Sequence, residues 1–158
     1  MDWVPYSTRE KARKIEKEMK KLEESGNEAP DDEDLAKAVG MSLGKFREAL
    51  LEISRMTLTL LQDSFYDGDM SNISEDVFIR DPETEMVITE MENILGQAIE
   101  RLPEKERFVV TLYYYEEMTM KEIGQTLNIS ESRVCQIHSS AIIRLHTRLK
   151  YADASIEV

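Results

Sequence analysis

The polar side chains that follow Ser130 have the types and spacing of a helix that lies in a DNA groove. Apolar residues at helical spacing would form one stripe of this helix, namely Val134, Ile137, Ala141 and Leu145. The other side is left mostly to short polar groups, which are Glu131, Ser132, Arg133, Cys135, Gln136, Ser139 and Ser140. Between residues 132 and 150 there are four Lys or Arg, two His and no carboxylate, so the segment is locally cationic. These features are those of a recognition helix.

Residue patterns for other chemistry are missing from the sequence. His138 and His146 are eight residues apart and have no cysteine or carboxylate at metal-ligand spacing on their helix. There is no glycine-rich phosphate loop, and the acidic clusters lack the pattern of a calcium loop. We therefore predict no catalytic residue, metal or cofactor, and interpret the single cysteine, Cys135, as a small side chain on a helix face.

The residues before this helix predict a helix-turn-helix over residues 119–138. Thr119 and Glu122 can form a capping box, Gly124 allows close approach of the partner helix, and Asn128 tolerates the left-handed backbone of a reversal. Ser130 can then cap the second helix. Such units also occur as purely structural corners, so this pattern alone leaves that interpretation open.

The same design occurs a second time, because residues 33–50 align without a gap on residues 121–138. Apolar or small residues fall on equivalent places, including Leu35 on Ile123 and Phe46 on Val134. We expect this first copy to be mainly structural and to pack against a helix over residues 8–24. That helix is rich in Lys and Arg, which suits either phosphate contact or a solvated surface.

Composition indicates an all-α protein of two small helical domains joined by an acidic linker. The 158 residues carry a net charge of −12, but residues 59–100 alone hold eleven acids and one base. We predict domains at 1–60 and 85–151, a linker at 61–84 and a frayed tail at 152–158. No apolar run is long enough for a membrane helix, no signal peptide is found, and the lone cysteine suits a reducing cytoplasm.

The second domain should begin with two helices that support the helix-turn-helix. Asp81 and Pro82 favour the start of a helix of about residues 84–101. Its predicted buried stripe is Val87, Met91, Ile94, Leu95, Ala98 and Ile99. A further helix after Pro103 is expected to turn Phe108, Val109 and Leu112 toward that stripe.

Two segments resemble bacterial sigma factors of the sigma-70 family. Residues 102–110, 118–124 and 130–139 are similar to region 4, and residues 2–13 are similar to the start of region 3 in the flagellar, or sigma-28, branch. The resemblance implies a promoter-specificity subunit of RNA polymerase. Its partners would be promoter DNA, the flap region of the polymerase core and an anti-sigma factor.

The resemblance also implies roles for individual residues. Ser132 and Gln136 would read bases of the minus-35 element, with Glu131 and Arg133 beside them, and Gln suits adenine. Thr119 and Ser139 would contact the DNA backbone. The residues expected near the minus-10 element are Asp2, Arg9 and Arg13.

Three departures from the family pattern affect these expectations. Tyr6 stands where the branch often has Arg, the chain opens directly at region 3 so that region 2 is missing from it, and the acidic balance predicts weak DNA affinity. Two other functions stay open, a module that binds the polymerase flap or an anti-sigma factor and the output domain of another transcription regulator. A compact form could also bury the recognition helix against the first domain.

Overall fold

The computed structural model describes the backbone of residues 6–66 and 81–156 and the side chains of residues 7–60 and 81–150. Every regular element within these ranges is a helix, which confirms the predicted all-α class. The elements are α1 (Tyr6–Glu24), α2 (Asp32–Val39), α3 (Leu43–Tyr66), α5 (Pro82–Glu100), α6 (Glu104–Val110), the π-helical turn η1 (Thr111–Tyr115), α7 (Met120–Leu127) and α8 (Glu131–Ile156). None of these helices has the length and hydropathy to cross a membrane.

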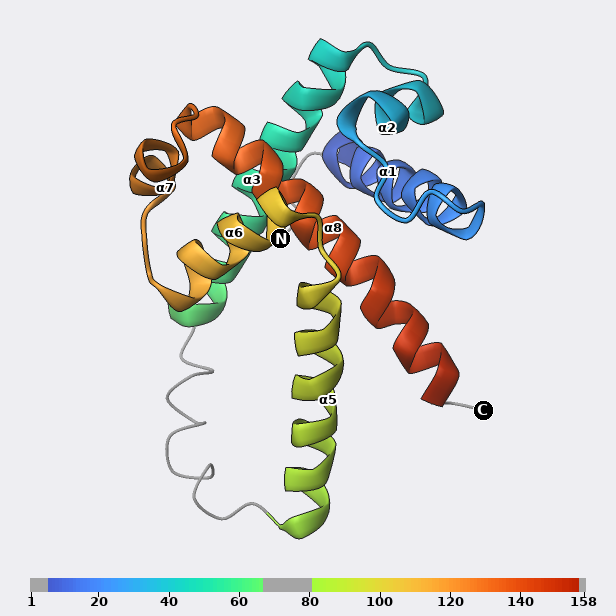
Figure 1. Cartoon of the computed structure of the whole chain (residues 1–158), viewed down its shortest axis with the longest axis vertical. Coiled ribbons are helices and arrows are strands. Elements are labelled where there is room, and N and C mark those ends of the chain that lie inside the picture. The colour runs from blue at the N-terminus through green and yellow to red at the C-terminus, as the bar shows by residue number, and fades with distance from the viewer. Residues whose placement is uncertain (1–5, 67–80, 157–158) are drawn as a thin grey trace.

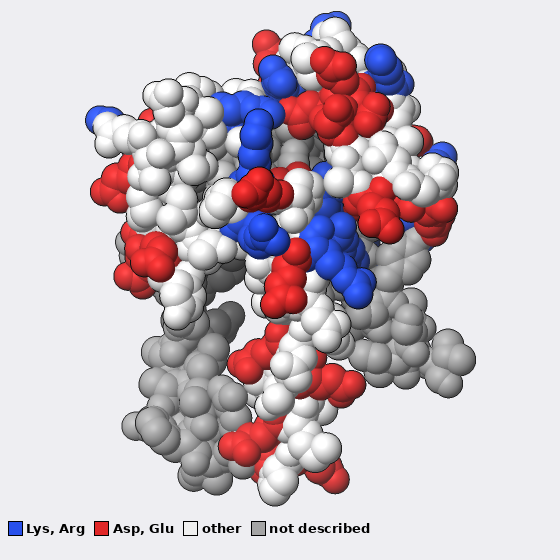
Figure 2. All heavy atoms as spheres, viewed as in Figure 1, with Lys and Arg blue, Asp and Glu red and all other residues white. Residues whose placement is uncertain are grey.

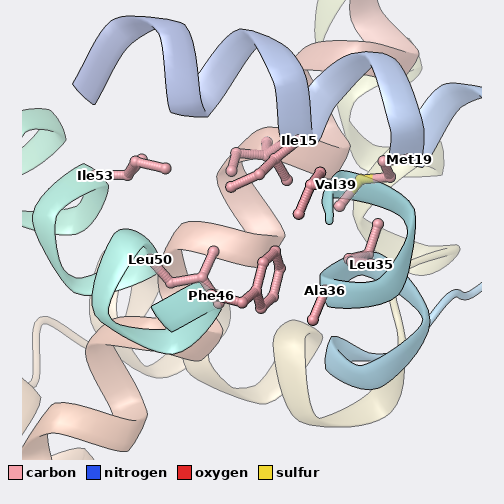
Figure 3. Packing of buried hydrophobic residues seen from close by; sticks show 9 residues of the cluster. Ile15, Met19, Leu35, Ala36, Val39, Phe46, Leu50 and Ile53 are labelled. Carbon is pink, nitrogen blue, oxygen red and sulfur yellow. The ribbon is translucent and has the colours of Figure 1, made fainter. Parts of the chain in front are cut away.

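Helices α1, α2 and α3 form a first unit around one apolar core. Both ends of α2 are fixed by neighbouring residues, because Asp31 and Asp34 form a capping box at its start and Gly40 ends it in the left-handed conformation. Figure 3 shows the buried side chains meeting between the three helices. They include Ile15, Met19, Leu35, Ala36, Val39, Phe46, Leu50 and Ile53. The first helix-turn-helix therefore packs against the lysine-rich helix α1, as expected.

Helices α5 to α8 form a second unit with two smaller apolar clusters. One joins α5, α6 and α8 through Ala98, Leu102, Val110, Ala141 and Leu145. The other joins α6, α7 and α8 through Val109, Met120, Ile123, Val134 and Ile137. The predicted apolar stripe of α8 is buried at all four positions, so that expectation is confirmed.

The prediction that the apolar stripe of α5 is buried is wrong for most of its residues. Val87, Met91 and Leu95 are exposed by 55%, 61% and 39%, and of the stripe only Ala98 is fully buried. Figure 1 shows the reason: α5 runs away from the other helices, and only its C-terminal end packs on them. Phe108 is likewise 46% exposed and does not face the α5 stripe as predicted, and Val109 is buried in the cluster with α7 and α8 instead.

Two predicted segments are more helical than expected. Helix α3 continues to Tyr66 and so enters the range predicted as linker, of which residues 67–80 lie outside the described part. Helix α8 continues to Ile156, where the sequence suggested a frayed tail from residue 152. Both helices therefore extend beyond the end that the spacing of their apolar residues predicts.

The two units pack against each other along α8. Figure 1 shows α8 crossing the molecule, with α1 and α2 on one side and α6 and α7 on the other. Helix α8 belongs to the second unit, yet Ile143 is part of the apolar core of the first unit. Helix α8 is therefore shared between the two units, and its surroundings come from both.

Candidate nucleic-acid interface

The local geometry of α7 and α8 is that of a helix-turn-helix, and it follows from four predicted residues. The Thr119 hydroxyl accepts from the Glu122 backbone N–H at 3.1 Å, and the Glu122 carboxylate accepts from the Thr119 N–H at 3.1 Å. Asn128 ends α7 with φ of 58°, in the left-handed region. Ser130 then accepts from the Arg133 N–H at 3.1 Å. The predicted caps and reversal are confirmed.

Gly124 is required by the closeness of the turn. A Cβ built on Gly124 would lie 2.8 Å from the carbonyl oxygen of Ile129, which is a backbone atom. Any larger residue would push the turn away from α7. The angle between the two helices, and hence the direction of the α8 N-terminus, depends on this contact.

The predicted DNA-contacting residues begin at the exposed N-terminus of α8 and continue into the interface between the two units, which we call the seam. Glu131 and Ser132 are exposed, and Arg133 and Gln136 are half-buried. Ser139 is only 1% exposed, so it does not lie on an open polar face as the sequence suggested. The first unit covers the part of α8 that faces it.

Three of these side chains bind the first unit directly. Arg133 donates from Nη1 to the Asp32 carboxylate at 2.7 Å. Gln136 donates from Nε2 to the Arg47 carbonyl at 3.3 Å, and Ser139 donates to the Leu50 carbonyl. The Asp32 carboxylate therefore occupies the Nη1 side of the Arg133 guanidinium, which a phosphate could otherwise bind. DNA and the first unit cannot use these donors at the same time.

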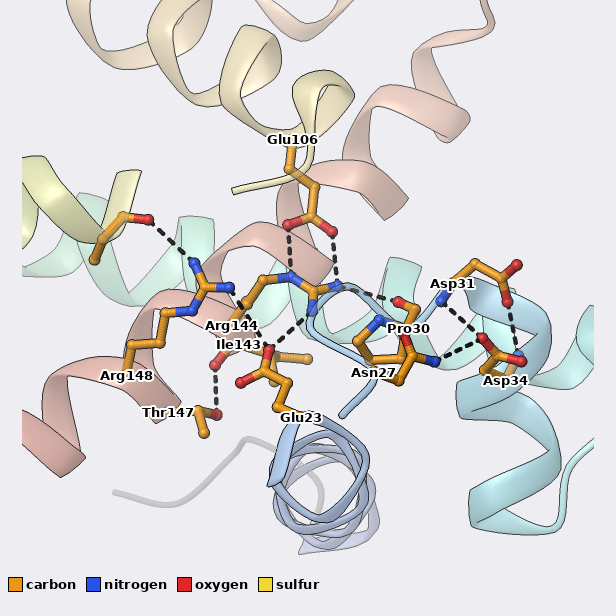
Figure 4. Close-up of polar contacts among 11 residues, drawn as sticks. Glu23, Asn27, Pro30, Asp31, Asp34, Glu106, Ile143, Arg144, Thr147 and Arg148 are labelled. Carbon is orange, nitrogen blue, oxygen red and sulfur yellow. Dashed lines mark hydrogen bonds and ion pairs between the residues drawn. The ribbon is translucent and has the colours of Figure 1, made fainter. Parts of the chain in front are cut away.

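A buried arginine anchors α8 deeper in the same seam. Arg144 is 1% exposed and donates to Glu106 through Nε at 3.0 Å and Nη2 at 3.2 Å. Figure 4 shows that it also reaches across to the first unit. There it meets Glu23 at 3.0 Å and the Pro30 carbonyl at 3.2 Å. Burial alone would lower the pKa of Arg144, but Glu106 and Glu23 outweigh it and raise that pKa, so the guanidinium stays charged.

A polar contact between His138 of α8 and Tyr114 of η1 is a further feature that the sequence did not predict. His138 is fully buried, and its Nε2 lies 2.7 Å from the Tyr114 hydroxyl of η1, while its Nδ1 has no partner. Burial lowers the pKa of His138 to about 4 and raises the pKa of Tyr114 to about 12. The pair is therefore neutral near pH 7, which removes His138 from the cations available to DNA.

The residues predicted to lie near the minus-10 element are only partly described. Arg9 and Arg13 lie on the exposed surface of α1, and Asp2 lies outside the described residues. Lys11, between them, pairs with Glu52 of α3 at 3.3 Å. The two arginines therefore lie on the first unit, on the helix α1 that also packs against α8.

Comparison with known proteins gives a consistent assignment. The family model described as Sigma-70 region 3 matches residues 10–86, and the model described as Sigma-70, region 4 matches residues 98–146. The chain is 33% identical over 150 residues to RNA polymerase sigma factor FliA of Escherichia coli K12, covering 94% of this chain and 63% of that protein. It is 36% identical over 155 residues to RNA polymerase sigma-D factor of Bacillus subtilis 168, covering 94% of this chain and 60% of the relative.

A solved structure of a flagellar sigma factor is also similar to this chain. The cocrystal structure of the flagellar sigma/anti-sigma complex, Sigma-28/FlgM, matches 95% of this chain and 64% of the solved chain, with a TM-score of 0.50 and 31% sequence identity. The chain thus spans less than two thirds of the length of each of these matched proteins. The described helices, the two matched regions in order and these relatives show that the chain belongs to the sigma-70 family and carries its regions 3 and 4.

Proposed function

We propose that the chain is the promoter-recognition part of a sigma factor that directs RNA polymerase to motility-type genes. The observation that carries the proposal is the capped helix-turn-helix of α7 and α8, with Ser132, Arg133 and Gln136 close together at the start of the second helix. The relatives named as flagellar sigma factors support the class of promoter. Such a subunit would act in the cytoplasm.

The chemistry of this face suits the minus-35 element. The amide of Gln136 can donate to and accept from the edge of adenine, and Ser132 is short enough for close approach. Arg133 and the backbone-facing Thr119 can bind phosphate and fix the register of the helix. Arg9 and Arg13 on α1 would contact DNA near the minus-10 element, with Asp2 beside them.

DNA binding of this kind needs an opened arrangement. Arg133, Gln136 and Ser139 all bind the first unit, so α8 must leave that unit before it enters a groove. Binding to the polymerase core, with the flap region contacting the second unit, would supply the free energy for opening. An anti-sigma factor that prefers the closed arrangement would oppose it.

A second function is favoured by the exposed apolar side of α5. Met86 is 72% exposed and Val87 and Met91 more than half exposed, on a helix whose charged side chains are all acidic. Figure 2 shows acidic groups along this helix without basic ones. Such a surface is typical of a protein contact, and it suits docking to the polymerase flap or to an anti-sigma factor.

The test is binding of the full chain to fluorescent duplexes that contain or lack a minus-35 element of the flagellar type, with and without the isolated polymerase flap domain. We expect specific binding, stronger with the flap, that weakens at least about tenfold in Gln136→Ala. Gln125→Ala is the matched control, because Gln125 is exposed on α7 and has no predicted base contact. Equal binding to both duplexes under all conditions would contradict the proposal.

A further inference from the structure

The first unit offers α8 a surface on which acids of the first unit meet bases of α8, and one of these acids, Asp32, also pairs with Arg47 of α3 at 3.3 Å. Three acids of the first unit receive five bases of α8. Glu16 pairs with His146 at 3.2 Å and Lys150 at 3.3 Å. Glu23 pairs with Arg144 at 3.0 Å and Arg148 at 3.9 Å. Asp32 pairs with Arg133 at 2.7 Å.

An apolar contact lies within this row of ion pairs. Ile143 is 6% exposed and packs in the first unit's own core, among side chains of α1, α2 and α3. Its neighbours on α8, Ala141 and Leu145, pack instead in the second unit. Ile143 is therefore the side chain that α8 contributes to the other unit's interior. We call the surface made by Glu16, Glu23, Asp32 and the place of Ile143 the acidic socket.

Removing α8 from the acidic socket breaks its ion pairs and exposes its apolar site to water. When α8 departs for DNA, Glu16 and Glu23 lose their partners on α8, Asp32 keeps only Arg47, and an apolar site becomes exposed on the first unit. Nucleic acid is excluded as a new occupant, because the carboxylates repel phosphate. A cationic protein segment with one aliphatic side chain among its bases would restore both the ion pairs and the apolar contact.

We infer that the acidic socket is a docking site for a basic amphipathic helix of another protein, and that α8 is its internal occupant. The spacing on α8 defines the partner: an aliphatic residue equivalent to Ile143, with bases one, three, five and seven positions later. Such a helix competes with α8 for the first unit and releases the recognition helix. The inference goes beyond DNA recognition, and its test uses no DNA, so failure of the proposed function would leave it standing.

The socket is vacated by changing α8 alone. Ile143→Asp in the full chain places a carboxylate against an apolar site flanked by acids, while the apolar stripe that holds α8 in the second unit is untouched. Opening is followed by energy transfer between dyes on Lys37→Cys and Gln125→Cys, two exposed positions on different units, with Cys135→Ser removing the native thiol. Circular dichroism verifies that the helices persist.

The probe is a fluorescent peptide of residues 131–150 with Val134→Gln, Ile137→Gln and Leu145→Gln, which prevent it from packing on the second unit. We expect it to bind the Ile143→Asp chain at least about tenfold more tightly than the unmodified chain, where α8 occupies the socket. Binding should weaken at least about tenfold when the peptide itself carries Ile143→Asp, or when the chain also carries Glu23→Lys. These two controls test the apolar and the ionic contact separately.

A second open chain guards against misfolding of the first. Arg133→Glu, His146→Glu and Lys150→Glu together reverse three of the five pairs at positions that are not fully buried. If either chain opens by energy transfer yet fails to bind the peptide at about 100 µM, the inference is overturned. Binding that is indifferent to Glu23→Lys would overturn it as well, because the carboxylates would then have no part in recognition.

Discussion

Replacing Arg144 by alanine should destabilise the chain more than any other single change at the seam. Arg144 is buried, and its loss strands the Glu106 carboxylate, whose side chain is 10% exposed, without its two donors. Breaking one side of a buried ion pair typically costs about 3–5 kcal/mol. For a chain of this length such a loss corresponds to a fall in Tm of about 10 °C.

The assay is urea unfolding followed by circular dichroism, with two controls. Lys21→Ala removes an exposed pair with Glu18 and should cost at most about 0.5 kcal/mol. Arg144→Met combined with Glu106→Leu removes both charges and should recover most of the lost stability. Burial already raises the pKa of Glu106, partly offset by Arg144, so the cost of Arg144→Ala should shrink as acid protonates that carboxyl. A cost no larger than that of Lys21→Ala would refute the reasoning.

Three further changes test the local structure of the second unit, each by the free energy of unfolding in urea. Gly124→Ala should destabilise by about 1–3 kcal/mol despite the better helix propensity of Ala, because its Cβ meets the Ile129 carbonyl, and a gain in stability would contradict the close turn. Thr119→Ala should cost about 1 kcal/mol through the lost cap, and no loss would mean that the cap contributes nothing. Because the pKa of His138 is lowered to about 4 in the folded chain, the unfolded chain binds the His138 proton first as the pH falls from 6.5 toward 4. The free energy of unfolding should therefore fall by at most about 3 kcal/mol over that window, and less steeply in His138→Leu. Equal slopes in the two chains would contradict a buried, neutral His138.

The parts of the fold that depend on neighbours in sequence could be predicted from the residues. Thr119, Glu122, Asn128 and Ser130 specify caps and a reversal within a dozen residues, and the structure has all of them. The repeated helix-turn-helix and its packing on the lysine-rich helix were predicted from spacing in the same way. Local hydrogen bonding and helical periodicity are sufficient at these places.

A compact form with the second helix against the first domain was one expectation from the sequence, but the residue pairs of the seam could not be predicted, because they are far apart in the chain. Arg133 meets Asp32 across 101 positions and Arg144 meets Glu23 across 121. Periodicity shows that one side of α8 is polar, but it does not distinguish a polar side that faces water from one that faces an acidic surface. The same ambiguity explains α5, whose apolar stripe has helical spacing but little to pack against.

We propose above that α8 reads promoter DNA once it leaves the first unit. The most direct measurement is anisotropy of a duplex carrying a minus-35 element, against a scrambled duplex, with the unmodified chain, the Ile143→Asp chain and the Ile143→Asp chain that also carries Gln136→Ala. We expect weak binding by the first, at least about tenfold tighter and sequence-specific binding by the second, and loss of specificity in the third. An opened Ile143→Asp chain that binds both duplexes equally, or neither, would contradict this proposal.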